Sequence, residues 1–163
     1  MRITFVLFLL LYPTLNTAFA QVSPVTLTEL TRTMEASGDT MLVINFWATW
    51  CSPCIEELPY FEMLHKNSNN KPIRVILVSL DFRSQLDSKV KPFFNKHGYT
   101  APALLLDESD ANAYIDRIHP EWSGAIPATL VLQPSSGRRA FYERKFESYE
   151  ELDKTVQSFI ERR

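Results

Sequence analysis

The chain has 163 residues, of which 45% are hydrophobic and 12% are aromatic. This length suits one compact domain and this composition supplies a core, which argues against two domains and against a disordered chain. The formal net charge of −2 gives no general attraction to phosphate groups, so we expect no nucleic-acid partner.

The first twenty residues have the pattern of a signal peptide. Arg2 and the amino terminus supply positive charge, and residues 3–11 form an apolar core. Ala18 and Ala20 then place small residues at the positions that a signal peptidase requires. We therefore predict cleavage after Ala20 and a periplasmic or otherwise exported mature protein.

A retained membrane anchor is the alternative interpretation of this segment. Pro13 and the polar residues that follow it leave an apolar run shorter than the roughly 18 residues needed to span a bilayer. Cleavage is therefore favoured, and it divides the chain into a signal peptide at 1–20 and one domain at 21–163.

Helical and strand-like patterns alternate along the mature chain. Leu27, Leu30 and Met34 recur at helical spacing, whereas residues 41–47 are a nearly continuous apolar run typical of a buried strand. The predicted helices span residues 26–37, 52–67, 84–97, 109–118 and 149–162. The predicted strands span residues 41–47, 73–80, 103–106, 128–132 and 139–146.

The order of these elements predicts the fold class. The strands at 41–47 and 73–80, joined by a helix, form a β-α-β unit and should lie parallel with a right-handed crossover. The last two strands flank a turn at 134–137 and should form an antiparallel hairpin. We therefore expect a three-layer α/β/α protein with a mixed central sheet.

The only two cysteines, Cys51 and Cys54, stand where a predicted strand meets a predicted helix. Their spacing on a first helical turn allows a disulfide, which needs Cα atoms about 4.4 to 6.8 Å apart. A helix N-terminus stabilises a thiolate, so Cys51 is the expected nucleophile. Cys54, one turn inside, should resolve the mixed disulfide, and this chemistry implies no metal or organic cofactor.

Three other roles for the cysteine pair are open. A zinc site needs about four ligands, and neither a second Cys-x-x-Cys motif nor a close group of histidines accompanies the pair. A purely structural disulfide across so short a loop would remove little entropy from the unfolded chain. Two unreactive buried cysteines are a further alternative, but a helix start after a strand is where a thiolate is stabilised. These arguments favour redox chemistry.

Two segments resemble a known family. Residues 45–54, NFWATWCSPC, resemble the active-site segment of thioredoxin-fold proteins, in particular the TlpA-like branch of exported bacterial disulfide reductases. Residues 122–129, WSGAIPAT, resemble the loop of that family that carries a cis-proline. The resemblance covers residues 40–159 and implies a thioredoxin-like domain with thiol:disulfide oxidoreductase activity.

The resemblance also implies roles for single residues. Pro127 would form a cis bond opposite the cysteines, so that the backbone of Ile126 pairs with an extended client segment; the residues alone suggest an ordinary turn proline. Trp50 would border the reactive sulfur. Trp122 would shape the substrate groove, although core packing explains it equally well. Pro53, directly before the second cysteine, accompanies reducing members of the family.

One position departs from thioredoxin itself. Thioredoxin has a buried aspartate behind its cysteines where this sequence has Asn45, which cannot accept a proton. Asp81 ends the predicted strand at 73–80 and is the candidate for deprotonating Cys54. The alternative for Asp81 is an exposed residue that caps the next turn.

The function that these patterns predict is a periplasmic protein-disulfide reductase. Its clients would be disulfide-containing exported proteins, in cytochrome c maturation or general disulfide repair. A membrane thiol electron donor would re-reduce it, and we expect a monomer. The alternatives are a thiol peroxidase-like member of the same fold and a redox-sensing binding module.

Overall fold

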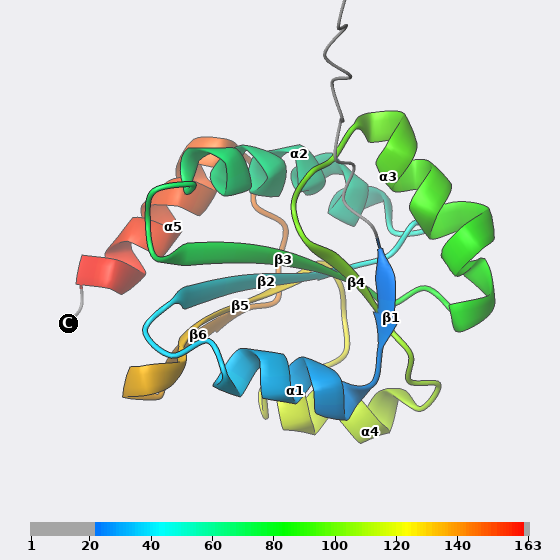
Figure 1. Ribbon diagram of the computed structural model, residues 1–163, viewed down its shortest axis with the longest axis horizontal. Helices are drawn as coiled ribbons and strands as arrows, with labels where there is room; N and C mark the ends of the chain where they lie inside the picture. The colour runs from blue at the N-terminus through cyan, green and yellow to red at the C-terminus, as the bar shows by residue number, and fades with distance from the viewer. Residues whose placement is uncertain (1–21, 162–163) are drawn as a thin grey trace, which may run out of the picture.

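The computed structural model describes residues 22–161, which form a six-stranded sheet with helices on both faces (Figure 1). The strands are β1 (Ser23–Val25), β2 (Met41–Trp47), β3 (Ile73–Ser79), β4 (Ala103–Leu106), β5 (Ala128–Gln133) and β6 (Arg138–Tyr142). The α-helices are α1 (Leu27–Glu35), α2 (Ser52–Asn67), α3 (Lys91–His97), α4 (Ala111–Ile118) and α5 (Tyr149–Glu161).

The predicted signal peptide at 1–20 lies outside the described residues and stays a prediction. Within residues 22–161, none of the helices combines the length and the apolar character that crossing a membrane requires.

The sheet is mixed, as the sequence predicts. Its strand order is β1-β4-β3-β2-β5-β6. The strands β1, β4, β3 and β2 are parallel to one another, whereas β5 is antiparallel to both β2 and β6. The central strand β2 is therefore covered by β3 on one side and β5 on the other, and all of its residues are buried.

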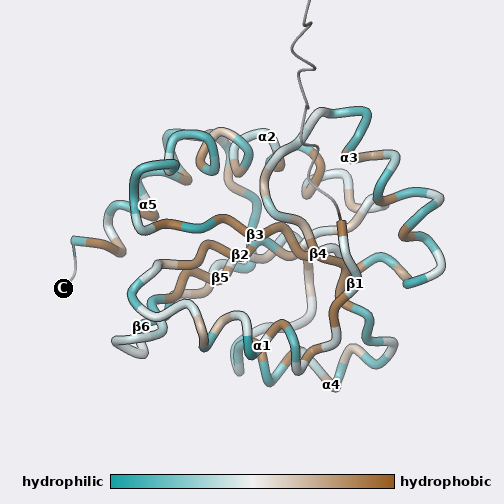
Figure 2. The backbone as a smooth tube through the Cα atoms, in the orientation of Figure 1, coloured by the Kyte–Doolittle hydropathy of each residue, from teal (hydrophilic) through white to brown (hydrophobic). Residues whose placement is uncertain are grey.

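Alternate residues of β2 supply two separate cores. Met41, Val43 and Trp47 pack with α2, α3 and α5, whereas Leu42 and Ile44 pack with α1 and α4. Figure 1 shows these two groups of helices on opposite sides of the sheet, and in Figure 2 the hydrophobic colour is concentrated on the strands between them. The three-layer α/β/α prediction is confirmed.

The helix predicted over residues 84–97 is not one continuous element. The chain instead forms a 3-10 turn (Arg83–Gln85), a π-helical turn (Leu86–Val90) and then α3. Pro92 at the start of α3 explains the change, because it has no N–H group for the preceding turn and its ring widens that turn.

The last strand is shorter than the prediction of 139–146, because β6 ends at Tyr142. The residues that follow leave the sheet and make hydrogen bonds elsewhere. The carboxylate of Glu143 binds the loop before β5, and the N–H of Phe146 donates to the side chain of Glu57. The sequence also gave no indication of β1, which pairs with β4 over only three residues.

Candidate active site

The two cysteines lie at the beginning of α2, as their position in the sequence predicts. Cys51 is the N-cap residue, and its Sγ accepts a hydrogen bond from the N–H of Cys54 at 3.3 Å. The pair forms a disulfide with its Cα atoms 5.3 Å apart. Cys51 is 6% exposed and Cys54 is fully buried, so a client can reach only the first sulfur.

The start of α2 suits a reactive thiol. Its first N–H groups have no partner within the helix, and its macrodipole places positive charge beside Cys51. Pro53 occupies the first turn, where a missing N–H group costs nothing and a fixed φ angle favours the helix. Once the disulfide is reduced, these features favour a thiolate at Cys51.

The loop before β5 contacts the reactive sulfur. The bond between Ile126 and Pro127 is cis, as the resemblance implies. The carbonyl oxygen of Ile126 lies 3.7 Å from Sγ of Cys51. A backbone segment therefore runs directly beside the disulfide, although it belongs to a part of the chain 75 residues away.

The side chains of Trp122 and Glu143 hold this loop in place. The indole N–H of Trp122 donates to the carbonyl of Ala125 at 2.8 Å, and its ring packs on Phe46 with centroids 4.9 Å apart. Trp122 is only 3% exposed, so its contacts are with the core and the loop. Trp50, in contrast, is 64% exposed and stands immediately before Cys51.

Glu143, which the sequence did not single out, is the second support of the loop. Its carboxylate accepts hydrogen bonds from the N–H of Ala125 at 3.0 Å and from both the N–H and the hydroxyl of Ser123. Burial raises the pKa of Glu143, but these hydrogen bonds outweigh it and the pKa lies below its ordinary value. The charged form of Glu143 therefore fixes the backbone that precedes Ile126.

Asp81 is buried, at 2% exposure, and ties two strand ends together. Its carboxylate accepts from the N–H of Thr49 at 2.9 Å, from the Thr49 hydroxyl at 2.5 Å and from the Ser79 hydroxyl at 2.8 Å. Thr49 lies just before the cysteines in the chain. Asp81 thus fixes the segment that leads into α2, and its role as proton acceptor stays a prediction.

A second buried carboxyl group, Glu57, was missed by the sequence analysis. It is fully buried and lies one helical turn after Cys54 on α2, which places both side chains on the same face of the helix. Its carboxylate accepts from the side-chain amide of Asn45 at 2.8 Å and from the N–H of Phe146 at 2.7 Å. Burial raises the pKa of Glu57 to about 7, although these hydrogen bonds act in the opposite direction.

A signal for Glu57 was present in the sequence. Cys54, Leu58 and Phe61 form the buried stripe of α2, and Glu57 falls within that stripe. An acidic residue on the buried face of a helix is rare without a partner or a function. The position of Asn45 in β2 was the second clue, because strand alternation points it toward the α2 side of the sheet.

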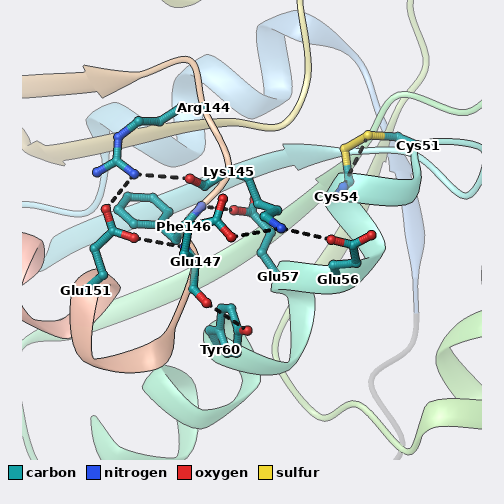
Figure 3. A network of polar contacts seen from close by, with 10 residues as sticks. All are labelled: Cys51, Cys54, Glu56, Glu57, Tyr60, Arg144, Lys145, Phe146, Glu147 and Glu151. Carbon is teal, nitrogen blue, oxygen red and sulfur yellow. Dashed lines mark hydrogen bonds and ion pairs between the residues drawn. A yellow bond between two sulfur atoms is a disulfide. The ribbon is translucent and has the colours of Figure 1, made fainter.

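The segment after β6 covers Glu57 and is attached to α2 at three points (Figure 3). Lys145 forms an ion pair with Glu56 at 2.9 Å, and the hydroxyl of Tyr60 donates to the carbonyl of Glu147 at 3.1 Å. Between them, the N–H of Phe146 donates to Glu57. We call residues 144–147 the covering segment.

Comparison with known proteins assigns the family. The sequence matches the AhpC/TSA family over residues 12–136. The chain belongs to the AhpC/TSA family. The matched range includes both cysteines, Glu57, Asp81 and Pro127, but it ends before the covering segment. Part of the site in this AhpC/TSA protein is therefore built by residues beyond the family match.

Individual relatives of this AhpC/TSA protein carry redox names. It is 30% identical to the thiol-disulfide oxidoreductase ResA of Oceanobacillus iheyensis over 102 residues, which are 63% of this chain and 47% of the relative. It is 35% identical to the thioredoxin-like protein YneN of Bacillus subtilis over 79 residues, which are 48% of this chain and 45% of the relative. The chain spans about half the length of these curated relatives.

Solved structures confirm the thioredoxin-like fold. A thiol:disulfide interchange protein from Chlorobium tepidum has a TM-score of 0.63 at 21% identity, covering 77% of this chain and 83% of the other. StoA from Bacillus subtilis has a TM-score of 0.56 at 22% identity, covering 72% and 82%. At these identities the likeness establishes the fold of the AhpC/TSA protein.

Proposed function

We propose that the protein is a thiol:disulfide oxidoreductase that reduces disulfides in exported client proteins. The observation that carries this proposal is the pair Cys51 and Cys54 at the start of α2, with the cis-proline loop in contact with the outer sulfur. Relatives named thiol-disulfide oxidoreductase support it. The activity requires no cofactor beyond the cysteine pair.

The first chemical step uses the exposed cysteine of the reduced protein. The Cys51 thiolate attacks one sulfur of a client disulfide, which breaks the client's S–S bond and releases its other sulfur as a thiolate that takes up a proton. A client strand beside Ile126 can pair with the free backbone edge of the loop, in the manner of an added β-strand. Trp50 offers an exposed apolar surface to the same client.

The second step releases the client and requires a proton acceptor. The Cys54 thiol loses its proton and attacks Cys51, so the mixed disulfide breaks, the client leaves with its second thiol and the protein disulfide forms. Glu57 lies on the same helical face, and a pKa near 7 allows it to accept that proton at neutral pH. Asn45 and Phe146 hold its carboxyl group in place. Asp81 is the alternative acceptor.

Each turnover removes two electrons from the protein, so a reductant must restore the thiols. We propose an exported protein that is re-reduced by a membrane thiol donor, because the first twenty residues have the pattern of a signal peptide. Amino-terminal sequencing of the exported protein tests whether the signal peptide is removed. Gln21 as the first residue supports cleavage, and a retained Met1 supports the anchor.

The direct test of the activity is reduction of a disulfide peptide by the pre-reduced protein. We expect Cys51→Ser to abolish reduction, whereas Cys54→Ser should accumulate a covalent complex with the client. The equilibrium potential should lie near the roughly −270 mV of thioredoxin. A potential near about −120 mV would reverse the proposed electron flow. Rapid consumption of peroxide without peptide reduction would instead favour the thiol peroxidase alternative.

A further inference from the structure

A shallow groove lies beside the active site, on the side of α3. It encloses about 370 Å³ and is lined by Thr49, Trp50, Lys89, Pro92, Phe93 and Lys96. Trp50, one of these lining residues, directly precedes Cys51, so the groove adjoins the reactive cysteine. We call it the lysine groove.

The apolar part of the lysine groove consists of the rings of Trp50 and Phe93. Trp50 is 64% exposed and contributes an accessible aromatic surface. Phe93 is half-buried, because its ring packs against Trp47 with centroids 5.3 Å apart and against His97 with centroids 4.4 Å apart. A ring fixed in this way offers a preformed contact for an apolar side chain, at little cost in conformational entropy.

The charged part of the groove has a single sign. Lys89 and Lys96 are exposed and stand seven residues apart, about two helical turns, so they flank Phe93 along one side. Neither has an ion-pair partner within residues 22–161, whereas the neighbouring Lys91 pairs with Asp87 at 2.6 Å. Two uncompensated cations thus face one groove in a protein whose net charge is −2.

We propose that the lysine groove binds an acidic segment of the client next to its disulfide. An apolar client side chain lies on Trp50 and Phe93, and carboxylates beside it meet Lys89 and Lys96. This inference rests on the proposed function and specifies its substrate class. The pairs are solvent-exposed, so each is weak, and their main effect is on association with the client. Together they should favour acidic clients about fivefold.

The test uses two disulfide peptides that differ only at two positions beside the cysteine, which are Asp in one and Lys in the other. The reduced protein should show a kcat/KM about fivefold higher for the acidic peptide at low ionic strength. Salt at about 0.5 M should remove the preference, because it screens exposed charges. Equal rates at low salt would overturn the proposal while leaving the oxidoreductase function intact.

Variants locate the effect within the groove. We expect K89E/K96E to reverse the preference and K89Q/K96Q to abolish it. The matched control is K71E/K154E, which changes the net charge by the same amount at exposed lysines outside the groove and should keep the preference. A control that loses the preference would show a general charge effect and overturn the proposal.

Binding without chemistry separates the groove from the proposed function. A cysteine-free acidic peptide is added to the oxidised protein, and amide chemical shifts are followed by NMR. Shifts at Trp50 and Phe93, both of which the variant keeps, that disappear in K89E/K96E support the groove even if no peptide is ever reduced. Absence of binding to the wild-type protein would reject the groove, whatever the reductase assay gives.

Discussion

Asp81 and Glu57 are two buried carboxyl groups near the disulfide, and they differ in the hydrogen-bond donors that surround them. Asp81 accepts hydrogen bonds from three donors on Thr49 and Ser79, one of them a backbone N–H. Glu57 accepts from only two donors, and burial raises its pKa to about 7. The three donors suit Asp81 to tying segments together, and the raised pKa of Glu57 is the reason that we propose it as the group that exchanges a proton.

The largest effect that separates the two groups is expected from Glu57→Gln. If Glu57 accepts the proton of Cys54, this variant should reduce disulfide peptides about a hundredfold more slowly above pH 7. The step to measure is release of the client from the mixed disulfide, by rapid mixing over a range of pH. Glu35→Gln, which removes one charge at an exposed position on α1, is the control and should behave like the wild type.

The second effect concerns stability against pH. Because the folded-state pKa of Glu57 is raised from 4.5 to about 7, the folded protein binds its proton more tightly than the unfolded chain does. The resulting stabilisation is complete below pH 4.5 and is lost as the pH rises through about 7. The part lost between pH 5 and pH 8 should amount to about 2 to 3 kcal/mol. Urea unfolding of the wild type and of Glu57→Gln at pH 5 and pH 8 measures this loss. An equal change in the free energy of unfolding for both proteins between the two pH values would contradict the prediction.

A smaller and different effect is expected from Asp81→Asn. The amide accepts weaker hydrogen bonds than a carboxylate, so the free energy of unfolding should fall by about 1 to 2 kcal/mol. Client release should change less than about threefold if Asp81 only positions Thr49. Thermal unfolding and the rapid-mixing assay check the two parts. If Asp81→Asn removes the pH dependence of release and Glu57→Gln keeps it, Asp81 is the proton acceptor.

The smallest effect is expected at Glu143, which holds the cis-proline loop through Ser123 and Ala125. Removing its charge by Glu143→Gln weakens the hold on Ser123 and Ala125, so KM for a disulfide peptide should rise about threefold. The rate with a small aromatic disulfide should not change, because such a substrate does not pair with the backbone of Ile126. Glu121→Gln, an exposed residue on the same loop, is the control. Equal losses with both substrates would show that Glu143 acts on the cysteines themselves.

The sequence predicted those parts of the site that follow from local pattern. The strand β2 and the helix α2 have the predicted bounds, 41–47 and 52–67. Each could be predicted because its hydrophobic pattern lies within one short segment of the sequence. The cysteine pair lies at the helix start for the same reason. The cis bond before Pro127 required the resemblance, since the residues alone suggest only a turn.

The parts that escaped prediction depend on contacts between distant residues. β1 is too short to show a period, and it becomes a strand only because β4 offers an unpaired edge. The buried stripe of α2 already places Glu57 on the inner face, but its hydrogen-bond partners Asn45 and Phe146 come from other segments of the chain. The end of β6 is likewise set by what Glu143 and Phe146 bind outside the sheet, and no local pattern contains that information.

The covering segment has a consequence for the order in which the active site is assembled. Phe146 follows Glu57 by 89 residues, so the cysteines and Glu57 are synthesised long before the residues that enclose them. An emerging chain can close its disulfide while Glu57 is still in water with an ordinary carboxyl pKa. The proton transfer that we propose for Glu57 near neutral pH therefore requires the carboxyl-terminal portion of the chain to have been made and to have folded onto α2.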